Sequence, residues 1–112
     1  MERDELVAML MRSVKRFNSW REENPDEKID LSGVYLVRLN LEGINFSGAN
    51  LYGASFYEAN LREANFQEAN LIRANFGEAD LGEANFDMVK MDFATWQMVV
   101  KSLRAPVRIE DK

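Results

Sequence analysis

Residues 49–88 read ANLYG ASFYE ANLRE ANFQE ANLIR ANFGE ADLGE ANFDM. Each unit of five begins with alanine, continues with Asn, Asp or Ser, and places Leu or Phe third, in strict alternation. Less regular units lie on both sides, so that thirteen units cover residues 29–93. Self-similarity at a fixed period is the sequence signature of a solenoid, in which each unit packs only on its neighbours.

A period of five fits neither regular element. On an α-helix, a step of five residues rotates the large side chain steadily around the axis, so no apolar stripe forms. On a straight strand, an odd step sends successive large side chains to opposite faces. The chain must therefore bend once per unit and keep every large residue inside.

The Leu/Phe alternation suggests how many units close one turn. If four units make a turn, residues twenty apart stack, so that Phe46, Phe66 and Phe86 form one column and Phe56 stacks on Phe76. Like residues then pack on like, which suits aromatic rings in offset layers. A turn of two units satisfies the alternation as well, so the pattern favours four without requiring it.

The units resemble the A-[DN]-[LF]-x-x pattern of the pentapeptide-repeat family. The lead-in FNSWREENPDEKIDLSG, residues 17–33, is similar to that of small bacterial members, notably cyanobacterial ones. The resemblance implies an all-β solenoid, a right-handed quadrilateral β-helix, here of about three coils. Together with the helical patterns at both ends, we expect an N-terminal helical cap with a lead-in turn (1–28), the β-helix (29–93) and a C-terminal helical cap with its tail (94–112).

The chain before the repeats predicts one helix from about Arg3 to Glu23. Apolar residues recur there at three- and four-residue steps, and Asn24-Pro25-Asp26 ends the pattern. A solenoid exposes apolar core and unpaired backbone at its ends, so we expect this helix to cover the first coil. An amphipathic helix that binds a partner or a membrane surface is the alternative.

A second helix is expected after the repeats, with Asp92 or Thr95 as its N-cap and Pro106 as its end. Its apolar stripe consists of Trp96, Val99, Val100 and Leu103. Such a stripe serves a cap and a dimer interface equally well, so the sequence allows a monomer or a homodimer.

Composition excludes several classes of function. The chain has no cysteine and no histidine, which removes disulfides, thiolate ligands and the commonest general base and metal ligand. No phosphate-binding glycine loop is present, so we expect no enzyme, cofactor or metal. A net charge of −5 argues against direct nucleic acid binding. No signal peptide or membrane span is evident, so we expect a cytoplasmic protein.

Function must then reside on the outer surface. One candidate is a set of regularly spaced acidic residues, Glu58, Glu63, Glu68, Glu78 and Glu83. Some pentapeptide-repeat proteins mimic duplex DNA and bind DNA gyrase, so an acidic DNA-mimic inhibitor is the alternative function. About three coils is short for such a mimic, and a solvated surface explains the charge as well.

The other candidate is a weakly charged patch of Tyr35, Val37, Tyr52, Tyr57 and Ile72, which come into register with four repeats per coil. Gly77 and Gly82 should leave the surface nearby without side chains. Tyrosine-rich patches resemble the cores of protein interfaces. The sequence therefore favours a non-enzymatic scaffold or regulatory module that binds a protein, whose identity it does not reveal.

Overall fold

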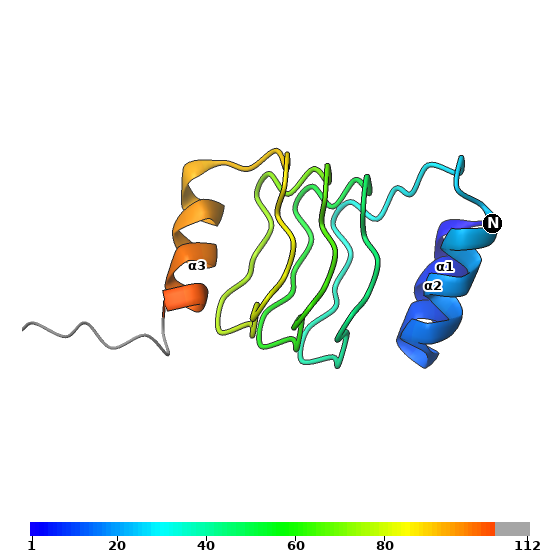
Figure 1. Ribbon diagram of the computed structural model, residues 1–112, viewed down its shortest axis with the longest axis horizontal. Coiled ribbons are helices and arrows are strands. Elements are labelled where there is room, and N and C mark those ends of the chain that lie inside the picture. The colour runs from blue at the N-terminus through cyan, green and yellow to red at the C-terminus, as the bar shows by residue number, and fades with distance from the viewer. Residues whose placement is uncertain (105–112) are drawn as a thin grey trace, which may run out of the picture.

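The computed structural model describes residues 1–104 and shows a stack of coils with helices at both ends (Figure 1). Helices α1 (Arg3–Arg12) and α2 (Val14–Glu23) lie at the N-terminal end, and α3 (Phe93–Arg104) lies at the other. The predicted stop at Pro106 and the residues after it lie outside the described residues.

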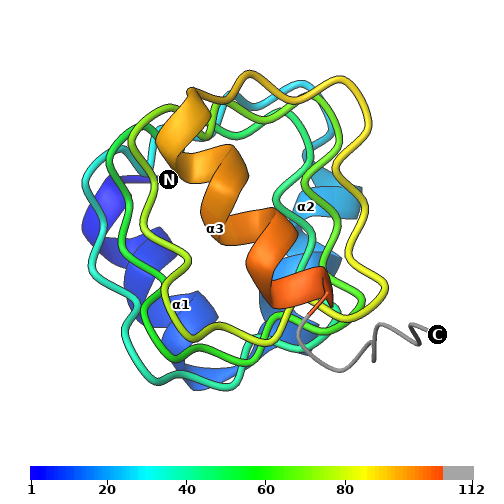
Figure 2. The same cartoon turned by 90° about the vertical axis from the view of Figure 1, so that its left-hand side faces the viewer.

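Each turn of the chain takes four repeats and has four sides (Figure 2). Parallel bridges join residues twenty apart, such as Asp30 to Asn50 and Asn50 to Asn70. The N–H of Leu31 donates to the Asn50 carbonyl at 2.8 Å, and the N–H of Asn50 donates to the Ile29 carbonyl at 2.8 Å. We number the sides by their repeats: side 1 (29–33, 49–53, 69–73), side 2 (34–38, 54–58, 74–78), side 3 (39–43, 59–63, 79–83) and side 4 (44–48, 64–68, 84–88).

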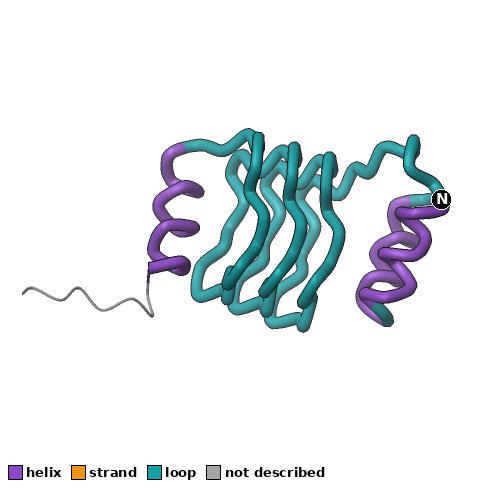
Figure 3. The backbone as a smooth tube through the Cα atoms, in the orientation of Figure 1, coloured by secondary structure: helices purple, strands orange, loops and turns teal. Residues whose placement is uncertain are grey.

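The coils of the expected β-helix contain very little regular strand. The described residues contain only isolated bridges and no extended strand (Figure 3). A corner follows every five residues, as in the turn that Ala54 N–H closes on the Leu51 carbonyl at 3.0 Å. Each side is therefore too short to build a ladder of its own, and hydrogen bonds between coils take the place of a conventional sheet.

The corners require left-handed backbone at the fifth residue of each repeat. Gly33, Gly43, Gly48 and Gly53 have φ between +68° and +74°, which glycine adopts without steric cost. The other corners use residues with side chains in the same conformation, with φ between +56° and +63°, namely Arg38, Glu58, Glu63, Glu68, Arg73, Glu78, Glu83 and Met88. Left-handed backbone costs such residues about 1 kcal/mol each, so the coil imposes this conformation on them.

The recurring Asn or Asp before each large residue has a local role. The Asn50 side-chain oxygen accepts the Tyr52 N–H at 3.1 Å, and the same bond recurs in the other Asn and Asp repeats. The amide also links coils, since Asn60 Nδ2 donates to Asn40 Oδ1 at 3.0 Å. Asparagine thus satisfies a turn N–H that the coil-to-coil pattern leaves without a partner.

The core consists of the large residues and alanines of the repeats. The rings of Phe56 and Phe76 stack with centroids 5.1 Å apart and planes 9° apart, and those of Phe66 and Phe86 do so at 5.2 Å and 9°. Rings from neighbouring columns meet edge to face, as Phe56 and Phe66 do at 75°. These are the two arrangements that the aromatic quadrupole favours.

The single helix predicted over Arg3 to Glu23 is in fact a pair. Ser13 is extended, with φ −159°, and its hydroxyl caps α2 by accepting the Arg16 N–H at 3.1 Å. The break lets both helices turn apolar residues toward the first coil, since Leu6, Leu10 and Phe17 are buried. The helical period of the sequence continues across Ser13, which is why it did not reveal the break.

Arginines of this helix pair satisfy the open edge of the first coil. Arg3 donates to the carbonyls of Asp30 and Ser32 at 2.9 and 2.6 Å. Arg21 donates to the carbonyls of Asn45 and Ser47 at 2.8 and 2.9 Å. The same carbonyl positions in later coils accept N–H groups from the coil before. Each guanidinium therefore replaces two donors of a missing coil.

Helix α3 crosses the end of the last coil (Figure 2). The Thr95 hydroxyl shares its one proton between Asp92 Oδ1 at 2.7 Å and the Ala74 carbonyl at 3.1 Å. The Ser102 hydroxyl donates to the Ala79 carbonyl at 2.7 Å, and Asp92 accepts the Arg73 N–H at 2.8 Å. Val99 is buried against the core. None of the helices within residues 1–104 has the length and apolar character needed to cross a bilayer.

Candidate interaction surface

The outer wall is divided electrostatically into two halves. Sides 1 and 2 with residues 89–93 carry four acidic and three basic residues, net −1, whereas sides 3 and 4 carry six acidic and one basic, net −5. The two halves are adjacent pairs of sides, so each forms a continuous surface running along the coils. We call them the tyrosine side and the acidic side.

All three tyrosines of the chain lie on the tyrosine side. Tyr35, Tyr52 and Tyr57 are 73%, 42% and 36% exposed. Val37 and Ile72, the other residues predicted for this patch, are partly buried in the same two sides. The corner between these sides carries two glycines and Arg73, so no carboxylate separates the tyrosines.

Tyr57 is held in place by its neighbours. Arg38 lies 5.9 Å from the centre of its ring, and the Arg38 Nε donates to Glu58 Oε1 at 2.6 Å. A Cβ at Gly77 would come within 3.0 Å of the ring. The surface over Gly77 is therefore not bare, contrary to expectation, because the Tyr57 ring covers it. A fixed aromatic loses less side-chain entropy on binding than a free one.

A shallow hollow of about 440 Å³ adjoins the tyrosine side. Ile72, Arg73, Ala74 and Asn75 line it from the coil, and Ala94 and Met98 line it from α3. Ile72 is thus the point at which the tyrosine side continues into a concave surface. Concavity next to exposed aromatic residues is common in binding sites.

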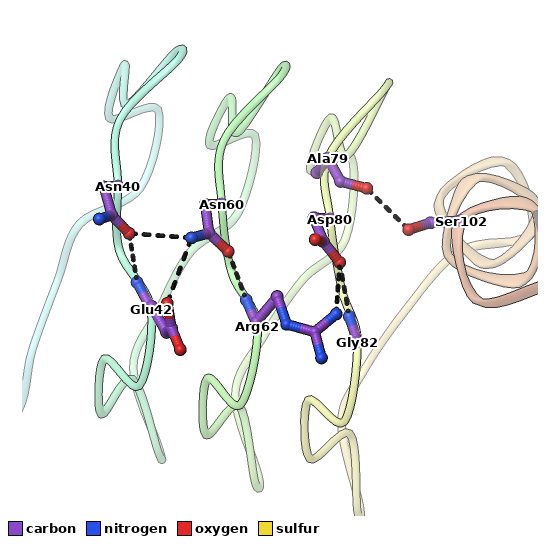
Figure 4. A network of polar contacts seen from close by, with 8 residues as sticks. All are labelled: Asn40, Glu42, Asn60, Arg62, Ala79, Asp80, Gly82 and Ser102. Carbon is purple, nitrogen blue, oxygen red and sulfur yellow. Dashed lines mark hydrogen bonds and ion pairs between the residues drawn. The ribbon is translucent and has the colours of Figure 1, made fainter. Parts of the chain in front are cut away.

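Two carboxylates of the acidic side, Glu42 and Asp80, take part in a polar network (Figure 4). Arg62 lies along the coils above Gly82 and reaches Asp80 Oδ1 at 3.5 Å, so Gly82 too is covered by a side chain. Glu63, Glu68 and Glu83 stand exposed at its corners. Glu58 and Glu78 stand at the corner shared with the tyrosine side, where Arg38 pairs with Glu58.

Two aspartates with perturbed acidity belong to the ends of the solenoid. Hydrogen bonds from the Ser32 backbone and side chain, with the Arg3 charge, lower the pKa of Asp30. Hydrogen bonds from the Arg73 N–H and the Thr95 hydroxyl lower the pKa of Asp92. Within residues 1–104, no cluster of three or more Asp or Glu is placed to hold a metal ion. The lowered pKa values of Asp30 and Asp92 therefore result from the hydrogen bonds of structural turns.

The apolar stripe predicted on the last helix is divided between two faces. Val99 is 1% exposed and Val100 is partly buried, whereas Trp96 and Leu103 are 52% and 40% exposed. Thr95, Met98 and Ser102 make the inward contacts that the apolar pattern missed, because two of them are polar. Arg38 and Arg62 were missed as well, although the twenty-residue register places them beside Glu58 and Gly82.

Family models give a direct match to the repeats. The model described as pentapeptide repeats matches residues 29–67 and 59–94, in eight copies. The chain belongs to the pentapeptide repeat family. Pentapeptide repeat proteins fold as right-handed quadrilateral β-helices, in agreement with the expected fold. A comparison with curated proteins finds no match.

Solved structures include similar pentapeptide repeat proteins. Rfr23 from the cyanobacterium Cyanothece 51142 is 36% identical with a TM-score of 0.54, over 56% of this chain and 44% of that one. QnrB1, a plasmid-mediated fluoroquinolone resistance protein, is 20% identical with a TM-score of 0.33, over 72% of this chain and 43% of its own. A protein of the Arabidopsis thaliana thylakoid lumen is 26% identical with a TM-score of 0.24, over 57% and 51%. This chain thus spans about half or less of each.

Proposed function

We propose that this pentapeptide repeat protein is a non-enzymatic scaffold or adaptor that binds a protein partner through its tyrosine side. The observation that carries the proposal is the segregation of all three tyrosines onto the half of the solenoid with net charge −1. Interface cores are enriched in tyrosine and depleted in charge. Exposed tyrosines spread over both halves would need no such explanation.

The geometry around Tyr57 supports the same assignment. Arg38 lies beside the ring, the ring packs over the bare backbone of Gly77, and Arg38 also pairs with Glu58, the next residue in the chain. The ring is thus ordered before any partner arrives, and the adjacent charge is already compensated. Preorganised aromatic residues of this kind are typical of residues that dominate binding energy.

Site-specific photo-crosslinking tests the proposal directly. A photoreactive phenylalanine analogue replaces Tyr52 in one protein and Gln67, on the acidic side, in another. Each is irradiated in lysate of the source organism, and products are identified by mass spectrometry. We expect a specific adduct from position 52, lost when Tyr57 is also changed to Ser, and none from position 67.

The control outcomes separate the two functions considered for this chain. Gyrase subunits crosslinked from position 67 and not from 52 would indicate a DNA mimic acting through the acidic side. Equal adducts from both positions would mean that the tyrosines do not define the surface. Thermal unfolding of each protein verifies that the substitutions leave the coil intact.

A further inference from the structure

The hollow beside α3 contains a cation that the described part of the chain does not pair. Arg73 and Asp92 are the charged residues that line it. The Asp92 carboxylate accepts the Arg73 N–H at 2.8 Å and the Thr95 hydroxyl at 2.7 Å, and both bonds stabilise its charge. The Arg73 guanidinium is exposed and forms no ion pair with any of residues 1–104. An incoming carboxylate would therefore find an unengaged guanidinium at the edge of the hollow.

Apolar groups adjoin this guanidinium. Ile72 precedes it on side 1, and Met98 lines the hollow from α3. Tyr52 lies one coil below Ile72, because the Gly53 N–H donates to the Ile72 carbonyl at 2.9 Å. Arg73 is thus bordered by an apolar concavity on one side and by an exposed aromatic residue on the other. Such a combination of a cation with apolar contacts is typical of protein interfaces.

The corner that ends at Arg73 is bare along the two earlier coils. Gly33 and Gly53 occupy it there, and a Cβ at either position would meet no atom within 4 Å. Tyr52 and Tyr57 stand in the two sides that meet at this corner. From Gly33 to Arg73 is two coil spacings, about 10 Å, which an extended segment of about three residues spans. The corner therefore leaves a straight path between the tyrosines that leads to Arg73.

We propose that the partner of the tyrosine side docks an extended acidic segment along this corner. The carboxylate of an Asp or Glu binds Arg73, and a neighbouring apolar side chain enters the hollow. This inference rests on the partner-binding role proposed above. Arginine binds carboxylates through two parallel N–H bonds and is enriched among the residues that dominate binding energy. A nucleic acid fits less well, because the chain carries a net charge of −5.

A phage-displayed library of random linear peptides, panned on the full chain, tests the inference. We expect the enriched peptides to contain Asp or Glu next to an apolar residue. A synthetic enriched peptide, measured by fluorescence anisotropy, should bind Arg73→Gln at least about tenfold more weakly than the wild type. The matched control is Lys15→Gln, which removes the same charge from an exposed position on α2 and should leave the affinity unchanged. Thermal unfolding establishes that both variants are folded.

Two further measurements separate the ion pair from the apolar contact. Raising NaCl from about 50 to 500 mM should weaken binding to the wild type much more than the residual binding to Arg73→Gln, because salt screens an exposed ion pair. Ala94→Gln places a longer polar side chain at the wall of the hollow that α3 provides. It should weaken binding without changing the dependence on salt.

Several results would overturn the inference. Enriched peptides without Asp or Glu, or acidic peptides that bind Arg73→Gln as tightly as the wild type, would remove the carboxylate from the site. An equal loss with Lys15→Gln would indicate attraction by charge alone. Failure to enrich any peptide would show that the corner takes no linear segment, and displacement of the peptide by a single-stranded oligonucleotide would favour a phosphate-bearing partner.

The photo-crosslink from position 52 distinguishes this inference from the function on which it rests. If the adduct persists while the peptide results are negative, the tyrosine side keeps its proposed role and only the acidic segment is wrong. If acidic peptides bind through Arg73 but position 52 gives no adduct, the carboxylate site is supported and the role of the tyrosines is contradicted.

Discussion

The N-terminal and C-terminal ends of this solenoid meet the same physical demand in different ways. Both ends expose apolar side chains and backbone groups that the next coil would otherwise take up. At the N-terminus, two helices bury the coil completely and charged guanidinium groups satisfy the backbone. At the C-terminus, one helix, two neutral hydroxyls and the Asp92 carboxylate cover the coil, and Phe86 stays partly exposed. The N-terminal coil is therefore more completely covered than the C-terminal one.

The strongest test of this difference uses one column of identical residues. Phe46 and Phe86 occupy the first and last positions of the Phe46–Phe66–Phe86 column, and only Phe46 is 0% exposed, with Phe17, Phe56 and Phe66 around it. We expect Phe46→Ala to lower the free energy of unfolding by about 3–5 kcal/mol and Phe86→Ala by roughly half as much. Urea unfolding at a protein concentration where the chain is monomeric measures both. Equal losses would show that the two ends are equally buried.

The polar contacts of the two ends give a second, smaller contrast. Arg21 donates to two carbonyls in a partly buried site, and burial lowers its pKa. Arg21→Met should destabilise the fold by about 2 kcal/mol, because two carbonyls lose a charged donor. Ser102→Ala removes one neutral bond and should cost about 1 kcal/mol. Hydrogen exchange of the first and last coils, measured with the unfolding free energy, should locate each loss at its own end.

Successive coils also differ in the residue that they place at the same corner, which gives a third comparison. Gly48 and Glu68 occupy successive turns of one corner, with φ of +68° and +63°. Gly48→Ala should cost about 1 kcal/mol, and Glu68→Gly should stabilise by about 0.5–1 kcal/mol, because glycine alone adopts this backbone freely. Shifts in the midpoint of thermal unfolding measure the effects of both substitutions. A loss of stability from Glu68→Gly would mean that the glutamate contributes contacts that exceed its backbone strain.

Acid should weaken both ends modestly. Asp30 and Asp92 have folded-state pKa values below their unfolded values, so their contribution is complete above about pH 4 and is lost as the pH falls through the lower folded values. Asp30→Asn keeps the acceptor that other repeats use and should flatten the dependence of stability on pH below 4. Asp92→Asn should do the same at the other end. The unfolding midpoint in urea from pH 6 to 2.5 checks this, and unchanged slopes would contradict it.

The repeat and its five-residue period could be predicted from the sequence. A five-residue period excludes helix and strand, and like residues at twenty-residue spacing indicate which side chains stack. The alternation of Leu and Phe favours the stacking of Phe56 on Phe76, but a two-repeat coil satisfies it as well, and the bridges between residues twenty apart decide for four. The same register would have revealed that Arg38 meets Glu58 and that Arg62 lies over Gly82.

Other features depend on contacts that no local pattern encodes. The break at Ser13 interrupts a helical period that is equally good on both sides, so only packing on the first coil requires it. In the sequence, Arg3 and Arg21 cannot be distinguished from ordinary surface charges, because only the fold brings the carbonyls that they bind close to them. On α3, the inward face uses Thr95 and Ser102, which a search for apolar residues passes over. Which positions face outward is easier to predict, because these positions follow directly from the repeat.

Arg3 and Arg21, in the first two helices, donate to main-chain carbonyls of the first coil. Every coil offers those carbonyls at the same spacing, so this polar part of the fit does not depend on the side chains that the coil displays outward, whereas the packing of Phe17 on Phe46 uses a core residue of the repeat. One coil of twenty residues could be inserted into the stack or removed from it, and helices α1 and α2 would still find the same carbonyls on the first coil. The outer wall is thereby free to diversify, and a gene of this kind can change length by whole coils while its N-terminal segment remains unaltered.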